Sequence, residues 1–318
     1  MQCDKCGKEA VIFQKYSGMH LCASHEIADV ERKIKKRMRQ DRMVVRGDHV
    51  AVAMSGGKDS AATLSILVET FSKRPDIKFT AITIDEGIEG YRNFSIPKVK
   101  ELCDRLGVPH IVVSFKDDID YTLDEMLKKE RKEASCTYCG VFRRMLLNRT
   151  AREIGANKLA TGHNLDDDAQ VVIMNIMNGD IERLARLRPS RIQEGLIPRI
   201  KPLMDVPEKE IALYAFLKKL PFYMGECPYA HESLRGEIKD MMNDFEARHP
   251  GTKYSVMRGF DSMVDCLKEK YKQVPLEKCE VCGEPSIEKL CQTCKLKKRI
   301  RIEKPKDKIP SGVSQTPE

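Results

Sequence analysis

Short apolar runs alternate with longer amphipathic stretches through the middle of the chain. The apolar runs predict buried strands at His49–Met54, Ile77–Ile84, His110–Ser114 and Lys158–Thr161. Helical periodicity predicts helices at Ser60–Ser72, Ile96–Leu106, Tyr121–Lys132, Val141–Ile154 and Asp167–Met177. Alternation of this kind is typical of βαβ units, so we expect an α/β fold with a mostly parallel sheet. Such sheets bind their ligands at the carboxyl ends of the strands.

The strand pattern ends near Asn178. Later segments predict helices at Glu208–Leu220, Glu232–Arg248 and Tyr254–Tyr271, and the Pro/Ser/Gly-rich residues Ile309–Glu318 predict disorder. The length of 318 residues suggests about two domains, or one core with appendages.

Composition narrows the class of protein. With 41% hydrophobic and 33% charged residues, the chain can bury a core beneath a charged surface, which excludes a disordered or collagen-like protein. The longest apolar runs, such as Val50–Met54, are far too short to cross a bilayer, and no signal-like segment opens the sequence. We therefore expect a cytoplasmic protein with no membrane partner.

Basic residues gather in a few segments of a chain whose net charge is +8. Arg32–Arg42 holds seven basic residues in eleven and predicts an exposed helix, and Lys295–Lys308 is a second basic run. Four arginines follow the predicted strands: Arg183, Arg186, Arg188 and Arg191. Each run alone fits a solvated face equally well, but together they favour binding to an RNA backbone. The low aromatic content of 6% favours a folded RNA recognised by its shape.

A glycine-rich segment follows the first predicted strand and opens the next helix. Its residues are Ser55, Gly56, Gly57, Lys58, Asp59 and Ser60. The glycines let backbone amides approach an anion, and the helix N-terminus and the Lys58 ammonium favour phosphate there. The spacing excludes a Walker A loop and a dinucleotide fingerprint. We predict a phosphate-binding loop, with a tight turn that binds nothing as the weaker alternative.

Cysteines at both ends of the chain have the spacing of tetrahedral metal sites. The N-terminal set is Cys3, Cys6, Cys22 and His25, and the C-terminal set is Cys279, Cys282, Cys291 and Cys294. In a reducing compartment, twelve cysteines favour metal binding over disulfides. The two close pairs in each set predict structural Zn²⁺ at each end.

A third set of cysteines lies inside the chain. Cys136 and Cys139 form a Cys-x-x-Cys pair, and Cys227 is the candidate third partner. Three thiolates suit a [4Fe–4S] cluster in which one iron lacks a protein ligand. A redox-active disulfide or persulfide pair and a buried thiol pair fit the spacing equally well. We expect the remaining Cys103 and Cys266 to be packing residues.

Taken together, these motifs resemble the tRNA 2-thiolation enzymes of the TtcA/TtuA type, which are PP-loop ATPases. The resemblance rests on the loop Ser55–Ser60, on Cys136–Cys139 with the following Gly140–Arg144, on Thr161–Ala169, on a lone Cys227 before Pro228, and on the two terminal knuckles. It runs from Cys3 to Cys294, and the knuckles favour the branch that makes 2-thiouridine.

The resemblance implies a parallel-sheet PP-loop ATPase core, like that of the adenine nucleotide alpha hydrolases, between two zinc knuckles. It implies that ATP and Mg²⁺ are held by Ala53, Ser55, Gly56, Gly57, Lys58, Asp59, Ser60, Ile84, Gly162 and Asp167. It also implies that Cys136, Cys139 and Cys227 hold a [4Fe–4S] cluster and act in catalysis with Asp59, Asp167 and Arg143. Among Asp166–Asp168 we expect Asp167 to be the functional residue, and one or both of the others to be ordinary helix N-terminal acids.

We therefore predict an ATP-dependent tRNA sulfurtransferase that forms 2-thiouridine. The uridine C2 oxygen would attack the α phosphorus of ATP, and sulfur delivered at the cluster would then displace AMP. The donor would be a ubiquitin-like sulfur carrier or free sulfide, the target uridine lies at the wobble position or in the T-loop, and the resemblance implies a homodimer. Two alternatives stay open: thiolation by persulfide or disulfide chemistry without a cluster, and a zinc-scaffolded RNA-binding protein that only senses nucleotide.

The same segments predict how the chain is organised. We expect an N-terminal zinc knuckle at 1–28, a basic helix linker at 29–47 and the PP-loop ATPase core at 48–200. A helical extension that completes the catalytic site follows at 201–274, then a C-terminal zinc knuckle at 275–298 and a basic, then disordered tail at 299–318.

Overall fold

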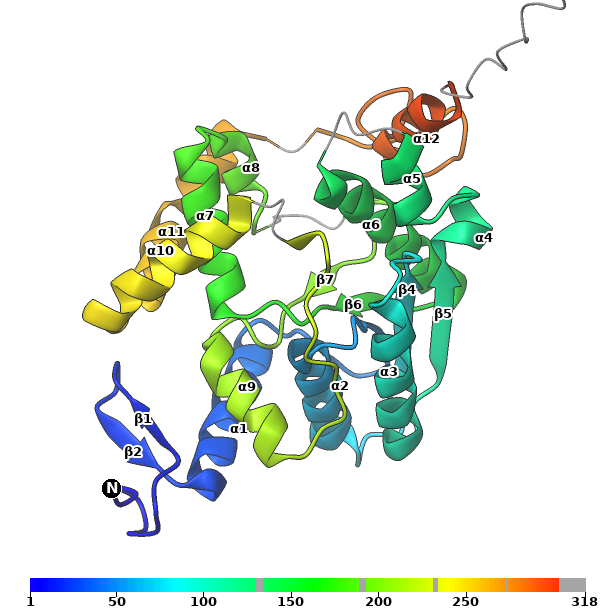
Figure 1. Ribbon diagram of the computed structural model, residues 1–318. Helices are drawn as coiled ribbons and strands as arrows, with labels where there is room; N and C mark the ends of the chain where they lie inside the picture. The colour runs from blue at the N-terminus through cyan, green and yellow to red at the C-terminus, as the bar shows by residue number, and fades with distance from the viewer. Residues whose placement is uncertain (130–133, 189–192, 231–233, 273, 303–318) are drawn as a thin grey trace, which may run out of the picture.

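The centre of the molecule is a five-stranded parallel sheet (Figure 1). The computed structural model describes residues 1–129, 134–188, 193–230, 234–272 and 274–302. In spatial order the strands are β5 (His110–Ser114), β4 (Lys78–Asp85), β3 (His49–Ala53), β6 (Lys158–Ala160) and β7 (Arg199–Ile200). The four predicted strands and the α/β fold class are confirmed. The fifth strand was not predicted, because two residues leave no periodic pattern.

Helices follow the strands as expected. They are α1 (Ala23–Gln40), α2 (Lys58–Phe71), α3 (Arg92–Leu106), α4 (Phe115–Ile119), α5 (Leu123–Lys129), α6 (Ser135–Glu153), α7 (Leu165–Met177), α8 (Ile181–Ala185), α9 (Glu208–Leu217), α10 (Leu234–Arg248), α11 (Thr252–Lys270) and α12 (Gln292–Ile302). The predicted start of α6 at Val141 was wrong, since the helix begins at Ser135 and includes Cys136 and Cys139. The segment predicted to be disordered lies outside the described residues.

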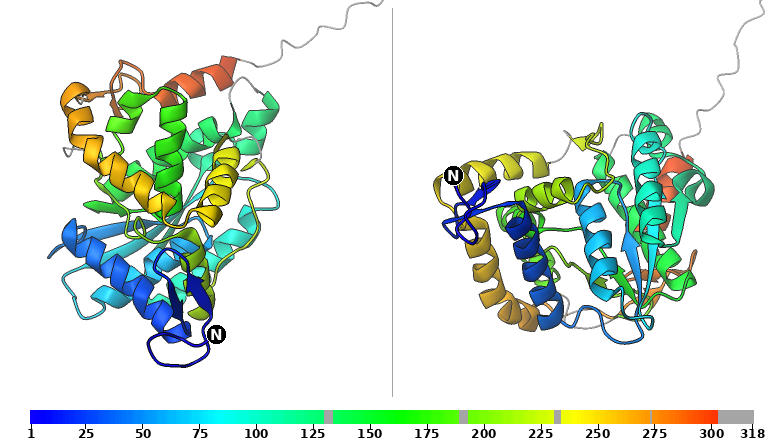
Figure 2. Two further views of the ribbon diagram at one scale, coloured as in Figure 1. Left: turned by 90° about the vertical axis from the view of Figure 1, so that its left-hand side faces the viewer. Right: turned by 90° about the horizontal axis from the view of Figure 1, so that it is seen from below.

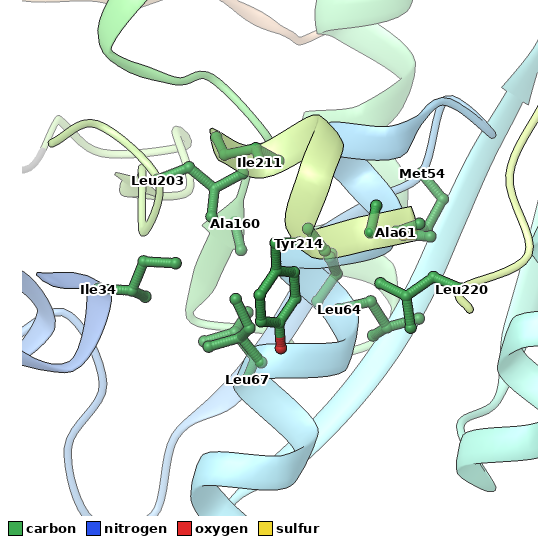
Figure 3. Close-up of a cluster of buried hydrophobic side chains, with 14 of the residues drawn as sticks. Ile34, Met54, Ala61, Leu64, Leu67, Ala160, Leu203, Ile211, Tyr214 and Leu220 are labelled. Carbon is green, nitrogen blue, oxygen red and sulfur yellow. The ribbon is translucent and has the colours of Figure 1, made fainter. Parts of the chain in front are cut away.

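Alternate residues of the central strands face two separate apolar cores, as the period of two along a strand requires. Val50 and Val52 of β3 face a core built with α1, α2, α3 and α9, where Tyr214 packs against Leu67 and its neighbours (Figure 3). Ala51 faces the opposite core, built with α4, α5, α6 and α12. The sheet is therefore covered on both faces, as parallel sheets require.

Beside the sheet, a third apolar cluster joins α7, α8, α10 and α11 (Figures 1 and 2). Val172, Leu184, Met242 and Phe260 belong to it. This cluster ties the late helices to the helix that begins at the end of β6. Across the described residues, none of the helices combines the length and apolar character needed to span a membrane.

A small cysteine module lies toward each end of the chain, and the two modules sit far apart (Figure 1). The first contains the hairpin of β1 (Ile12–Gln14) and β2 (Met19–Leu21), and the second contains β8 (Glu277–Lys278) and β9 (Pro285–Ser286). Tyr16 of the first module donates a hydrogen bond of 2.5 Å to Glu210 on α9. In the second, Glu284 pairs with Arg152 on α6 at 2.5 Å. Both modules are thus anchored to the α/β core.

Two expectations about exposure were wrong. The basic segment Arg32–Arg42 does not form a simply exposed helix, because Ile34 and Met38 are buried in the core and Lys33 pairs with Glu210 at 2.7 Å. Cys266 on α11 is exposed rather than packed, whereas Cys103 on α3 is buried as predicted.

Candidate active site

The glycine-rich loop lies where β3 ends and α2 begins. Gly56 has φ +86°, and a Cβ at this position would come within 2.7 Å of Ser95, so only glycine fits. Gly57 is the N-cap of α2, which leaves the first amides of the helix without intrahelical partners. Ser55 and Ser60 hold the loop closed, with their hydroxyl oxygens 3.2 Å apart. This geometry presents backbone amides to an anion at the carboxyl edge of the sheet.

A second loop, at the end of β6, packs directly against the first. A Cβ on Gly162 would lie 2.9 Å from the backbone of Asp59 and Ser60, so the close approach again requires glycine. The Asn164 side chain donates a hydrogen bond of 3.2 Å to Asp59. Gly162 and the Ser55–Ser60 loop, both predicted to contact ATP, are thereby brought together. Ala53 and Ile84 lie on the adjacent strands β3 and β4.

The phosphate loop carries one cation, Lys58, which contacts two carboxylates. The Lys58 ammonium lies 2.9 Å from both Asp59 and Glu208. Burial opposes the charge on Lys58, but these two carboxylates outweigh it and raise its pKa. The pKa of Asp59 is also raised, chiefly by burial and further by the nearby Asp167, despite the attraction of Lys58. Two carboxylates that repel each other beside a phosphate loop are the ligand type that Mg²⁺ prefers.

The three aspartates at the start of α7 have different surroundings. Asp166 is buried with Lys253, and Asp168 is buried 2.6 Å from Lys201. Asp167 is partly exposed, forms a capping box with Asn164 and pairs with Arg235 at 2.6 Å. All three aspartates thus have a cationic partner, but Asp167 is the one that is partly exposed and whose charge raises the pKa of Asp59.

The internal cysteines lie near a buried carboxylate. Cys139 accepts a hydrogen bond from Arg143 at 2.9 Å, and Arg143 also pairs with Glu86 at 2.7 Å. Burial raises the pKa of Cys227, and the nearby charges of Cys136 and Glu86 raise it further, whereas Arg143 lowers it. Burial, more than any neighbouring charge, raises the pKa of Cys139 to about 11. These contacts place Cys136, Cys139 and Cys227 in one region of the structure, but among the described residues only the two terminal sets bring their ligand atoms within 4.8 Å of one another.

Glu86 links this cysteine site to the phosphate loop. It is fully buried at the end of β4, where Arg92 pairs with it through two nitrogens. Another nitrogen of Arg92 donates a hydrogen bond of 2.7 Å to the backbone oxygen of Ser55. Burial would raise the pKa of Glu86, but Arg143 and Arg92 lower it overall. An unbroken polar network thus runs from the phosphate loop to Cys139.

The segment after α9 closes the site from the other side. The amide of Tyr223 donates a hydrogen bond of 2.8 Å to the carbonyl of Gly56. Further along, Tyr229 donates one of 2.8 Å to Asp124. Cys227 lies between these two attachments, so the late segment carries it back to the sheet edge.

The terminal cysteine sets are both assembled as metal sites. In each set, one ligand atom from every residue lies within 4.8 Å of the others: Cys3, Cys6, Cys22 and His25, and Cys279, Cys282, Cys291 and Cys294. The amide of His25, more than any other contact, lowers the pKa of Cys22 to about 6. Burial opposes ionisation of Cys279, but the amides of Cys291, Cys282 and Val281 lower its pKa to about 6. Thiolates are the form that binds metal.

Sequence reasoning gave Glu86, Arg92 and Glu208 no individual role in the site, although Glu86 lies in the segment Thr83–Ile88, which was expected near the nucleotide. Glu86 stands two residues after the predicted strand Ile77–Ile84, a position where ligands of parallel sheets bind, so a signal was present. Nothing in the sequence marks Arg92 or Glu208, because their partners are distant in the chain.

Comparisons with known proteins agree with this geometry. A family model described as a PP-loop domain matches residues 27–244, and one described as the N-terminal LIM domain of the 2-thiouridine synthetase TtuA matches residues 2–25. The tRNA 2-thiolation protein NcsA of Haloferax volcanii is 42% identical, over 93% of this chain and 98% of that protein. The tRNA-5-methyluridine(54) 2-sulfurtransferase of Pyrococcus horikoshii is 33% identical, over 95% of this chain and 96% of that protein.

A solved structure is similar along nearly the whole chain. It is the U34-tRNA thiolase NcsA from Methanococcus maripaludis with its [4Fe-4S] cluster. Its TM-score is 0.82 at 36% identity, and the match covers 94% of this chain and 96% of that one. With a phosphate loop between two terminal sets of residues that could ligate a metal, this chain belongs to the PP-loop family of tRNA 2-thiolation proteins.

Proposed function

We propose that this protein is an ATP-dependent tRNA 2-sulfurtransferase that converts a uridine to 2-thiouridine. The observation that carries the proposal is the polar network from Ser55 through Arg92, Glu86 and Arg143 to Cys139. It joins the proposed site for ATP to the proposed site for sulfur. Family membership supports the same reaction.

ATP is proposed to lie over the phosphate loop, with its phosphates against the amides of Gly56, Gly57 and Lys58. The remaining residues proposed to contact the nucleotide are Ala53, Ser55, Ser60, Ile84 and Gly162. Asp59 and Asp167 would hold Mg²⁺, whose charge would counter the burial and the weaker repulsion from Asp167 that raise the pKa of Asp59. In this arrangement Lys58 would turn from Asp59 and Glu208 to the phosphates.

Cys136, Cys139 and Cys227 are proposed to hold a [4Fe–4S] cluster. The donor set fits in kind, because Cys139 and Cys227 border the same apolar cluster, the charge of Cys136 reaches Cys227, and Arg143 donates a hydrogen bond to the Cys139 sulfur. The cluster would supply an iron without a protein ligand, where a sulfur donor can bind. The positive charge of Arg143 would offset the negative charges of Glu86 and of the cysteine thiolates.

In the proposed reaction the uridine C2 oxygen is first activated by adenylation and then replaced by sulfur. The uridine C2 oxygen attacks the α phosphorus, forming a new P–O bond and releasing pyrophosphate. Sulfur at the sulfide oxidation level then bonds to C2, and the oxygen leaves with AMP. This exchange is redox-neutral, so it needs no further reductant. The base must leave its stack to reach the site.

The terminal sites are proposed to hold one Zn²⁺ each, since a closed set of four Cys and His ligands is typical of structural zinc. We further propose a homodimer, a cytoplasmic location suited to free thiols, and a ubiquitin-like carrier or free sulfide as donor. The segments 1–28, 29–47, 48–200, 201–274, 275–298 and 299–318 are proposed as its functional units.

The test is reconstitution under anaerobic conditions. Protein containing iron and sulfide is incubated with Mg-ATP, sodium sulfide and a tRNA transcript, and the nucleosides are analysed by mass spectrometry and mapped by position. We expect 2-thiouridine together with equal amounts of AMP and pyrophosphate. Thiolation by protein without iron would favour persulfide chemistry, and tRNA binding without pyrophosphate release would favour an RNA-binding protein that only senses nucleotide.

A further inference from the structure

Arg144 differs from the other arginines of α6. Arg143, Arg149 and Arg152 pair with Glu86, Asp118 and Glu284 respectively. Within the described part of the chain, Arg144 pairs with no carboxylate, and neither does Arg199 on the edge strand β7. Both side chains are accessible to solvent. Among the described residues, Arg144 and Arg199 are thus two cations without a carboxylate partner, whereas the other arginines of α6 are paired.

Local packing holds the segment that carries Arg199 against the helix that carries Arg144. Asn148 of α6 donates a hydrogen bond of 2.9 Å to the carbonyl of Gly195 and accepts one of 2.8 Å from the amide of Ile197. Arg144 lies one helical turn before Asn148, on the same face of α6. Arg199 lies two residues after Ile197, so it points to the same side of the extended segment. The two bonds of Asn148 therefore hold Arg199 in the same region as Arg144, close enough for the charge of Arg144 to act on it.

The charges of the two arginines repel each other. Burial by surrounding atoms lowers the pKa of Arg199, and the charge of Arg144 lowers it further. Burial likewise lowers the pKa of Arg144, followed by the charges of Arg143 and Arg183. Gly140 keeps room for the guanidinium, since a Cβ there would come within 3.3 Å of an Arg144 nitrogen. A bound anion would relieve this repulsion.

The position of the pair favours one anion over another. Arg144 senses the charge of Cys139, which places it beside the cysteine site. The phosphate loop is connected to that site through Arg92 and Glu86, and Glu86 pairs with Arg143. Arg144 takes no part in these contacts and is exposed. An anion at Arg144 and Arg199 has to arrive from solvent, alongside the base that is modified.

We propose that Arg144 and Arg199 bind a backbone phosphate of the RNA substrate next to the uridine that enters the cysteine site. The inference rests on the proposed function, and deepens it by naming residues that position the substrate. Guanidinium groups match phosphate oxygens in pairs, which suits a diester that must be held in one orientation. A nucleotide whose base leaves the stack needs such a hold on its backbone.

The test measures tRNA binding separately from thiolation. Dissociation constants for an unmodified tRNA transcript are determined without ATP at several salt concentrations, for the full chain and for Arg144→Gln, Arg199→Gln and the double variant. Arg74→Gln is the matched control, because Arg74 is exposed and pairs with Asp76 away from the site. We expect each site variant to bind tRNA about tenfold more weakly, with a salt dependence reduced by about one phosphate contact. Arg144→Lys should restore most of the salt dependence.

Iron content, ATP binding and thiolation by the unaltered protein are measured alongside tRNA binding. Iron content and the dissociation constant for ATP should not change in either variant. Unchanged tRNA affinity, or weakened ATP affinity with unchanged tRNA affinity, would overturn the phosphate site. If the unaltered protein thiolates tRNA while the variants bind it equally well, only this inference fails. If the unaltered protein binds tRNA through Arg144 but forms no 2-thiouridine, the proposed reaction fails and the phosphate site stands.

Discussion

Arg143 contacts both the Cys139 sulfur, at 2.9 Å, and the Glu86 carboxylate, at 2.7 Å, and both partners favour its charged form. Replacing Arg143 with glutamine removes the cation but keeps a polar side chain. Hydrogen bonds to charged groups contribute about 1.5–3 kcal/mol, so we expect the thiolation rate to fall about tenfold or more. Single-turnover thiolation assays check this, and Arg143→Lys should recover part of the rate. Equal rates for all three proteins would exclude a role for the charge.

Glu86 is predicted to matter for stability as well as for the site. Glu86→Gln leaves Arg92 and Arg143 without their shared carboxylate, and breaking a buried pair in this way costs about 3–5 kcal/mol. The midpoint of urea unfolding should therefore move to a lower concentration. Glu89→Gln is the control, because Glu89 is exposed three residues further on and its loss should change the free energy of unfolding by under about 0.5 kcal/mol. Equal midpoints for the two variants would contradict this account.

The aspartates of α7 should separate into structural and reactive residues. Asp166→Asn leaves the buried Lys253 without a carboxylate, so we expect unfolding at a lower urea concentration. Asp167→Asn should instead reduce pyrophosphate release while changing the unfolding midpoint little, since Asp167 is partly exposed and its charge raises the pKa of Asp59. Pyrophosphate assays and urea titrations of both variants distinguish the two roles. The opposite pattern would assign the Mg²⁺ ligand to Asp166.

Removing a ligand from the C-terminal set should remove one metal ion and weaken the core. Cys279→Ser breaks a site that is tied to α6 by the Glu284–Arg152 pair. We expect zinc measured by mass spectrometry to fall from two per chain to one, and thermal unfolding to occur at a lower temperature. Cys266→Ser is the matched control, because Cys266 is exposed and belongs to neither set. Unchanged zinc in Cys279→Ser would refute the assignment.

The sequence predicted those parts of the site whose signals are local. The Ser55–Ser60 loop, the terminal cysteine sets and the strands around them depend on spacing within short segments, and the structure brings these residues together as expected. Arg92, Glu208 and β7 were missed because each is defined by partners far away in the chain. The error at Cys266 has the same origin, since the side of α11 that is buried depends on where α7 packs.

The packing of α12 against α6 bears on how the protein is made. Leu296 and Ile300 of α12 are buried in the same apolar cluster as Phe142 and Leu146 of α6. A ribosome releases the chain from its N-terminus, and domains tend to fold as they emerge. The helix that carries Cys136 and Cys139 is therefore synthesised long before the residues that cover its apolar face. Its packing stays incomplete until the C-terminal cysteine module has left the ribosome, so the reactive centre is finished late in translation.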